Sequence, residues 1–267
     1  MCVVVAVLVT LVSFAAVDRP SFDAASVKPN TSGSPSGTMR FWPGGRFTAS
    51  NVPLRKLVEA AYHIVPNRGL VSGGPAWVDS TGFDIEAKAG AGVIRPEMTN
   101  RQWVDATKLM LQTLLEQRFK LQTRHETKDM PIYRLVRAKG GVKLTKAPVR
   151  DCSAPRANCH GFEGGPGHGI EGHTDSMLDL SELLTFFADR IVRDATGLAG
   201  DFDIRTTGWA VARGRSDDSA NTSNEVIDPN GPSLFTVLEE QLGLKLEPAT
   251  GPVDLLVIQS AERPVEN

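Results

Sequence analysis

The sequence is poor in cysteine and aromatic residues, and it lacks the motifs of familiar enzyme classes. Its 267 residues include three Cys, two Tyr and four Trp, and aromatic residues make up 6% of the chain. There is no Gly-x-Ser-x-Gly elbow, no His-Glu-x-x-His pair, no Walker loop and no Gly-x-Gly-x-x-Gly turn after a predicted strand. The missing motifs favour a binding protein over an enzyme, and we expect no cofactor.

A large net charge is also absent. The formal net charge of −2 gives the whole chain no attraction to nucleic acid or to anionic membranes, so we expect no nucleic-acid partner. With 41% hydrophobic and 22% charged residues, the composition is that of an ordinary globular protein. Disorder, collagen and coiled coil are therefore excluded as descriptions of the whole chain.

The small net charge hides two halves of opposite sign. Residues 18–146 contain 20 Lys and Arg against 11 Asp and Glu, whereas residues 149–267 contain 9 against 20. Such an asymmetry indicates two lobes. Either the basic half meets a polyanion, such as a lipid headgroup, a teichoic-type polymer or a nucleic acid, or the two halves attract each other. The basic residues are scattered along the sequence, which favours the second interpretation.

The first residues have the pattern of a secretory signal peptide, which we assign to residues 1–16. The apolar run Cys2–Ala16 is too short to span a bilayer, and Ser13 and Ala15 supply small side chains for cleavage after Ala15. No Lys or Arg precedes the run, and an uncleaved anchor or a buried strand is the alternative. The interpretation predicts an exported protein, periplasmic or extracellular, that meets a membrane only transiently.

Two cysteines remain after the signal peptide, and we predict that Cys152 and Cys159 form a disulfide. An even number of cysteines in an exported chain is most simply explained this way. The competing interpretation is a metal site, because three histidines follow in a glycine-rich stretch: His160, His168 and His173. Six residues separate the cysteines, which does not fit the spacing of two to four residues typical of zinc pairs.

Hydrophobic periodicity predicts helices and strands in the same order in both halves. In the first half we expect a helix after Pro53, a strand at Phe83–Ala87, a helix with a capping box at Thr99 and Gln102, and two strands joined by a loop around Lys128 and Asp129. The two strands are placed at 119–126 and 132–138. A further strand is expected at Ser21–Pro29.

The second half matches the first in three blocks. Phe202-Asp203-Ile204 matches Phe83-Asp84-Ile85, Pro252–Val257 matches Pro131–Val136, and Leu238–Leu246 matches Leu114–Leu121 with one inserted residue. A helix led by Asp175 and another opened by Pro232 and ended by Gly243 occupy corresponding places. The apolar run 255–258 is expected to be a central buried strand. Matched blocks in one order indicate an internal duplication, although chance similarity of such patterns is the alternative.

We therefore predict an α+β fold of two duplicated lobes. Each lobe is expected to be roughly β-α-β-α-β-β, with helices packed on a mostly antiparallel sheet. The boundaries that follow from the sequence are a basic first lobe, a linker loop rich in Gly and His that carries the cysteine pair, and an acidic second lobe with a mobile polar insertion. These segments are residues 18–148, 149–175, 176–267 and, for the insertion, 213–231.

Five blocks of the sequence resemble a known family. They read GGRFTASNVPLRKLVEAAY, SGGPAWVDSTGFDIEAKA, LLEQRFKLQTRHETKDMPIYRLV, VRDATGLAGDFDI and LEEQLGLKLEPATGPVDLLVIQSAERPVEN. The combination resembles the "soil-associated" secreted protein family expanded in Acidobacteria, which carries a domain of unknown function. The resemblance implies an exported bacterial protein whose domain is sometimes fused to antibiotic-sensor-type membrane metallopeptidases. It supplies no catalytic residue.

Three functional hypotheses follow from the sequence. The first is a non-enzymatic module of the envelope or extracellular space that binds a ligand or protein between the lobes or at an exposed sheet edge. Three loop tryptophans, Trp42, Trp77 and Trp209, are candidates for its surface, although each could equally cover the core. The second is a metal-dependent hydrolase that uses His160, His168 and His173. The third is a sensory domain, which rests only on the fused relatives.

Overall fold

The computed structural model describes residues 19–149, 159, 161–210 and 230–265. The predicted signal peptide and most of the predicted insertion at 213–231 lie outside these residues. The fold is α+β, with 24% helix and 39% strand arranged in several antiparallel sheets, which confirms the predicted class. No helix among the described residues is long and apolar enough to cross a membrane.

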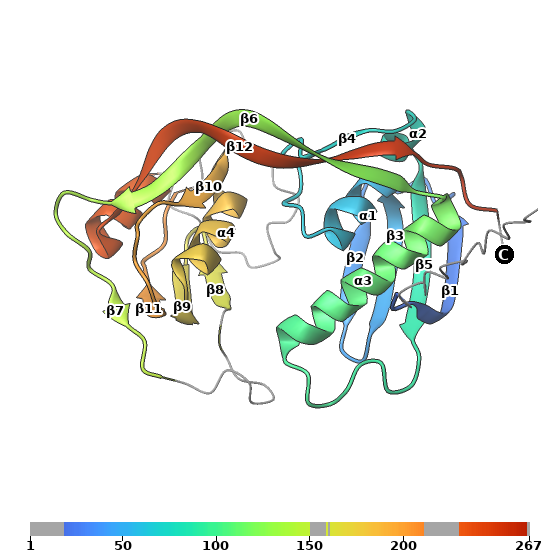
Figure 1. The fold of residues 1–267 in the computed structure, drawn as a ribbon, viewed down its shortest axis with the longest axis horizontal. Coiled ribbons are helices and arrows are strands. Elements are labelled where there is room, and N and C mark those ends of the chain that lie inside the picture. The colour runs from blue at the N-terminus through green and yellow to red at the C-terminus, as the bar shows by residue number, and fades with distance from the viewer. Residues whose placement is uncertain (1–18, 150–158, 160, 211–229, 266–267) are drawn as a thin grey trace, which may run out of the picture.

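The first lobe is built on a four-stranded antiparallel sheet of order β1-β5-β3-β2. Helices α1 and α3 pack against it, and the short helix α2 precedes β5 (Figure 1). The bounds are β1 Phe22–Pro29, β2 Thr38–Trp42, β3 Arg46–Pro53, β5 Gly82–Ala89, α1 Leu54–Ala61, α2 Trp77–Ser80 and α3 Asn100–Phe119. The capping box predicted at Thr99 and Gln102 begins α3, as expected.

The second lobe has a smaller antiparallel sheet of order β7-β11-β9-β8. Helix α4 packs against it, and α5 continues directly into a π-helix, η1, which ends at Gly243 in the left-handed conformation predicted for a helix stop. The bounds are β7 Thr145–Lys146, β8 Phe162–Gly165, β9 Gly169–Asp175, β11 Phe202–Arg205, α4 Met177–Phe187, α5 Leu234–Val237 and η1 Leu238–Leu242.

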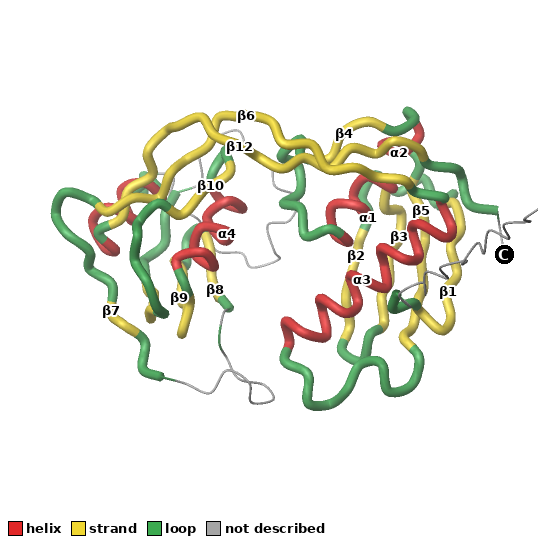
Figure 2. Tube along the Cα trace, in the orientation of Figure 1, coloured by secondary structure: helices red, strands yellow, loops and turns green. Residues whose placement is uncertain are grey.

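A third sheet joins the lobes, and we call it the bridging sheet. Its order is β10-β6-β12-β4, with bounds β4 Val71–Gly73, β6 Gln122–Arg137, β10 Ile191–Asp194 and β12 Leu244–Ser260. The two long strands β6 and β12 run antiparallel from one lobe to the other (Figures 1 and 2). At one end β4 pairs parallel with β12, and at the other end β10 pairs parallel with β6.

The two halves of the chain have equivalent topologies. In chain order, β1 to β6 correspond to β7 to β12, and α1 and α3 correspond to α4 and to the helix formed by α5 and η1. When each strand is replaced by its counterpart, the order β1-β5-β3-β2 becomes β7-β11-β9-β8, which is the order of the sheet in the second lobe. The same replacement turns the order of the bridging sheet into the same order read from its other edge. The matched blocks Phe83–Ile85 and Phe202–Ile204 accordingly fall in the corresponding strands β5 and β11.

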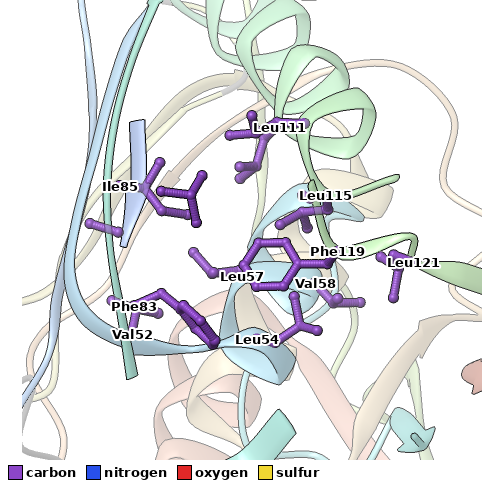
Figure 3. Close-up of a cluster of buried hydrophobic side chains, with 14 of the residues drawn as sticks. Val52, Leu54, Leu57, Val58, Phe83, Ile85, Leu111, Leu115, Phe119 and Leu121 are labelled. Atoms are coloured by element: carbon purple, nitrogen blue, oxygen red, sulfur yellow. The ribbon is translucent and has the colours of Figure 1, made fainter. Parts of the chain in front are cut away.

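Each half contributes its last strand to the core of the other lobe. In the first lobe, Leu256 and Ile258 of β12 pack with the buried residues shown in Figure 3. Within this core the rings of Phe83 and Phe119 meet edge to face, with their centres 4.9 Å apart. In the second lobe, Leu135 of β6 packs among the buried residues of α4 and η1. Neither core is therefore made from a continuous stretch of the sequence.

Three predictions about local structure are wrong. The predicted strands 119–126 and 132–138 are one strand, because β12 pairs with β6 continuously and holds Lys128 and Asp129 in the ladder. The predicted linker loop 149–175 contains β8 and β9, whose glycines allow close approach of neighbouring backbone. Helix α4 is capped by Ser176 rather than led by Asp175, since the Ser176 hydroxyl accepts from the Asp179 N–H.

Candidate functional site

The clearest candidate for a binding surface is the outer edge of β2. No other strand of the described residues pairs with this edge, so its backbone N–H and C=O groups are available. In Figure 1, β2 is the strand of the first lobe nearest the second lobe. The strand alternates, with Met39 and Phe41 opposite the buried Ala49 and Phe47, and with Arg40 and Trp42 on the outer face.

The outer face of β2 presents an aromatic ring and a cation. The Arg40 guanidinium lies 4.8 Å from the centre of the Trp42 ring, and the Trp42 indole N–H donates to the Thr48 hydroxyl at 2.9 Å. Trp42 is 36% exposed. Among the described residues, no carboxylate pairs with Arg40, which leaves its charge available to a partner. The geometry suits contact with an acidic or aromatic side chain.

The neighbouring strands add further positive charge to this face. Arg46 of β3 pairs with Glu86 of β5 at 2.9 Å, and Lys88 lies opposite Arg46 in the sheet. Lys28 of β1, at the opposite edge of the sheet, lies opposite Asp84, whose carboxylate accepts hydrogen bonds from within the lobe. The outer face therefore keeps a surplus of cations beside β2.

The second lobe has the equivalent open edge at β8. In Figure 1, β8 is the strand of its sheet nearest the first lobe, as β2 is the strand of its sheet nearest the second lobe. The β8 edge is shorter and contains Gly164 and Gly165, which offer no side chain to a partner. The β2 edge is thus the better candidate of the two.

Two arginines of the first lobe hold the two ends of α4. The Arg68 guanidinium donates to the carbonyls of Thr185 and Phe186, both at 3.0 Å, at the end of the helix where the dipole is negative. Arg101, at the start of α3, pairs with Asp179 in the first turn of α4 at 3.2 Å. The pair of Arg101 and Asp179, between the basic and the acidic half, agrees with the second interpretation of the charge asymmetry.

The aspartates of the two matched Phe-Asp-Ile blocks have the same structural role. Asp84 accepts the backbone N–H of Asn51 at 2.9 Å, and Asp203 accepts that of Thr174 at 3.3 Å. Asn51 and Thr174 both have positive φ, at 52° and 60°, and both stand three residues before the first residue of a helix. The aspartates hold these left-handed residues in place, which explains the repeated motif without catalysis.

Hydrogen bonds set the ionisation of Asp84. Partial burial favours protonation of this carboxyl, but the Asn51 N–H and the Asn30 amide, at 2.8 Å, outweigh it and hold the pKa of Asp84 below its usual value. The charged form of the side chain is therefore the one that maintains the irregularity around Asn51 near the end of β3.

Of the three predicted metal ligands, the structure describes two. His168 lies in the turn between β8 and β9, His173 lies in β9, and His160 is outside the described residues. His173 stands between two carboxylates, with Nε2 3.4 Å from Glu171 and Nδ1 3.5 Å from Asp203. Among the described residues no group of three His, Cys, Asp or Glu side chains could hold a metal ion. The metal site stays a prediction.

The predicted disulfide also involves a residue that the structure does not describe. Cys159 is half-buried just before β8, whereas Cys152 lies outside the described residues. The pairing of Cys152 with Cys159 therefore stays a prediction.

The three candidate tryptophans do not form one surface. Trp77 packs on Phe119 in the first lobe, with ring centres 6.4 Å apart, and Trp209 is buried against Phe187 in the second lobe. Only Trp42 combines exposure with an open strand edge. The rings of Trp77 and Trp209 pack in the cores of the first and the second lobe.

A small cluster of titratable groups lies where α1 and α3 meet. His63 has a positive φ of 55°, its Nδ1 is 3.1 Å from the Lys108 ammonium, and its Nε2 is 3.6 Å from Asp105. Burial and the Lys108 charge lower the pKa of His63, and burial also lowers the pKa of Lys108. No local pattern in the sequence indicates this contact, because His63 and Lys108 are far apart along the chain.

Comparison with known families gives one match. The family model described as "Protein of unknown function (DUF3738)" matches residues 55–261, more than half of the chain. No curated protein and no solved structure matches.

Proposed function

We propose that the chain, which belongs to the DUF3738 family of proteins of unknown function, is a non-enzymatic binding module that takes up an extended segment of a partner protein at the open edge of β2. The observation that carries the proposal is a five-residue strand with one unpaired edge, an exposed Trp42 and an available Arg40 charge. Addition of a strand at such an edge is a common mode of peptide recognition.

The side chains of β2 indicate which peptide would bind. A strand added beside β2 continues the alternation of the sheet, so its residues alternately meet the outer face and the side of Met39 and Phe41. On the outer face they meet Arg40 and Trp42, where a carboxylate is favoured. We therefore propose an extended segment with acidic residues at every second position and apolar residues between them.

The location of the protein is part of the proposal. Export is supported by the apolar run at Cys2–Ala16 and by the two cysteines, which we propose are joined in the mature protein. N-terminal sequencing of the secreted protein should begin near Ala16, and thiol titration under denaturing conditions should find no free thiol. A retained Cys2 or two free thiols would contradict this part of the proposal.

We also propose that the halves arose by internal duplication. The support is the equivalent strand order of the two lobes, together with the same aspartate–backbone contact at Asp84 and at Asp203. Chance is an insufficient explanation for both, because the contact requires a left-handed residue and an acceptor at corresponding places in each half.

Selection of peptides from a displayed random library tests the binding proposal. The full mature chain is the target, and hydrogen exchange of the complex shows where a selected peptide lies. We expect peptides with alternating acidic and apolar residues, and slower exchange of the amides of residues 38–42. Arg40→Glu should weaken binding about tenfold, equivalent to about 1.4 kcal/mol.

The matched control is Lys139→Glu, which makes the same charge change at an exposed turn residue away from β2. It should leave peptide affinity unchanged. Equal losses in both variants would show that net charge alone drives binding, and slower exchange at another surface would place the site elsewhere. Either result would overturn the assignment to β2.

A further inference from the structure

A second site lies in the first lobe, separate from β2. It is a cavity of about 710 Å³ between α3 and the ends of β6 and β12 that enter this lobe. Its volume is within the range of small-molecule sites, roughly 300–1,000 Å³. The polar residues that line it are Arg19, Gln112, Thr113, Glu116, Gln122, Thr123 and Gln259, and the ring of Tyr62 and the side chains of Leu109 and Leu121 add apolar surface.

The charges in the cavity neutralise each other. One guanidinium nitrogen of Arg19 lies 2.8 Å from both carboxylate oxygens of Glu116. The Thr113 hydroxyl donates to the Pro20 carbonyl at 2.8 Å and so fixes the segment that carries Arg19. A charged ligand would have to compete with the ion pair of Arg19 and Glu116. A neutral ligand can instead donate hydrogen bonds to the remaining lone pairs of the Glu116 carboxylate.

Three carboxamides converge on the same space. Gln112 donates its Nε2 to the Ala61 carbonyl at 2.8 Å, which orients its side-chain oxygen. Gln122 begins β6 and pairs with Ser260, and Gln259 occupies the irregularity between Ile258 and Ser260 at the end of β12. A bulge of this kind redirects a side chain out of the normal alternation. The carboxamides therefore offer the cavity both donors and acceptors, which can pair with polar groups on neighbouring carbons of a ligand.

The remaining wall has an apolar and a hydroxylic part. The Tyr62 hydroxyl bonds with Thr123, and the burial of the ring raises the pKa of Tyr62, so the phenol stays protonated. Leu109 is 48% exposed on the cavity side of α3, whereas Leu121 is buried. A ligand with one apolar face and a rim of hydroxyls satisfies both parts.

We infer that this cavity binds a neutral saccharide of one or two hexose units. A hexose presents adjacent hydroxyls, each a donor and an acceptor, to the carboxamides of Gln112, Gln122 and Gln259 and to Glu116. Its C–H face packs against Tyr62 and Leu109. The absence of net charge in the cavity selects against uronic acids and amino sugars with a free ammonium.

Nuclear magnetic resonance of the isotope-labelled full chain tests this inference, because each glutamine side chain gives its own pair of amide signals. The probes are cellobiose, maltose and N,N′-diacetylchitobiose, with glucuronate as the charged comparison. We expect at least one neutral disaccharide to shift the amide signals of Gln112, Gln122 and Gln259 with a dissociation constant of about 1 mM or lower. Glucuronate should shift none of them.

Two conservative variants and a control complete the test. Leu109→Ala, which removes part of the apolar wall at an exposed position, and Gln259→Ala should each weaken binding about tenfold while the melting temperature stays close to that of the unchanged protein. Gln241→Ala, which removes a glutamine of the second lobe that bonds to Thr207, should leave affinity unchanged. No shift of the three glutamines with any of the disaccharides at roughly ten times that concentration, or equal affinity in all variants, would overturn the inference.

Discussion

The backbone N–H of Asn51 and the carboxylate of Asp84 lie 2.9 Å apart, and the same contact recurs between Thr174 and Asp203 in the other half. In both lobes the contact joins one central strand to the last residues of the neighbouring strand, which leads into a helix. The position of α1 and α4 on their sheets therefore depends on one acceptor side chain in each lobe.

Replacement of Asp84 by alanine should destabilise the protein by about 1 kcal/mol, because it removes the acceptor for the Asn51 N–H and the Asn30 amide. The matched control is Glu86→Ala, two residues on along the same strand and on the same face, where an exposed ion pair with Arg46 is lost. That control should change the free energy of unfolding by less than about 0.5 kcal/mol. Urea unfolding measures both.

The effect of Asp84→Ala should depend on pH. The pKa of Asp84 is lower in the folded protein than its ordinary value of 3.8, so its contribution is complete above that value and is lost as the pH falls toward the folded pKa. The difference in stability between the unchanged protein and Asp84→Ala should therefore narrow below about pH 4. A difference that stays constant down to pH 2 would contradict this explanation.

The two arginines that hold α4 should differ in their effects. Arg68→Ala should cost about 1.5–3 kcal/mol, because its hydrogen bonds to the carbonyls of Thr185 and Phe186 are partly buried and involve a charge. Arg101→Ala removes an exposed side chain from its pair with Asp179 and should cost less than about 1 kcal/mol. Equal costs in thermal or urea unfolding would show that Arg68 contributes no more than a surface ion pair.

His63 should titrate below its ordinary pKa of 6.5. Burial and the nearby Lys108 ammonium disfavour the protonated ring, and Arg101 acts in the same direction, while Asp105 opposes them. Since the folded state binds the proton less well, the stability contributed by neutral His63 is complete above pH 6.5 and falls as the pH drops through 6.5 toward the folded pKa. The ring proton signals of His63 report the titration directly.

Lys108→Gln is the variant that tests the cause. Removal of the ammonium should raise the pKa of His63 and shift its titration toward 6.5, whereas Lys120→Gln, at the residue that caps the C-terminal end of α3, should leave the pKa of His63 unchanged. If His63 titrates above 6.5 in the unchanged protein, Asp105 rather than Lys108 determines its protonation.

The hairpin of β8 and β9 leads to a prediction about glycine. Gly169 has a φ of 87°, and a Cβ atom built there would lie 2.0 Å from the Thr206 carbonyl oxygen of the neighbouring segment. Gly169→Ala should therefore destabilise the second lobe by several kcal/mol, roughly 3 or more. Gly200→Ala, at a φ of 95° with no atom near, should cost only about 1 kcal/mol. Similar losses of unfolding free energy in the two variants would contradict the close approach of Gly169 to the Thr206 carbonyl.

Local signals in the sequence were sufficient for most helix ends and for the fold class. The hydroxyl of Thr99 and the side chain of Gln102 cap α3, and Gly243 ends η1, because these residues act within a few positions of themselves. The apolar run 255–258 is the central strand that was expected, between β6 and β4. The Phe-Asp-Ile repeat also identified corresponding strands correctly.

The sequence could not predict features that depend on distant parts of the chain. Lys128 and Asp129 look like loop residues, and only the partner strand, about 125 residues later, makes them part of β6. The contact of Arg68 with α4 and the convergence of Gln122 and Gln259 on one cavity likewise join residues more than a hundred positions apart. The open edge of β2 is visible only once the order of the strands is known.

Because β6 and β12 each run from one lobe into the other, their pairing determines when the molecule can fold. Leu256 and Ile258 complete the core of the first lobe, so that lobe stays unfinished until these residues have left the ribosome. Contacts between such distant residues slow folding, since a long loop must close before they form. For the export that we propose, this delay would keep the polypeptide unfolded during passage through a translocation channel and postpone folding until both β6 and β12 have reached the far side of the membrane.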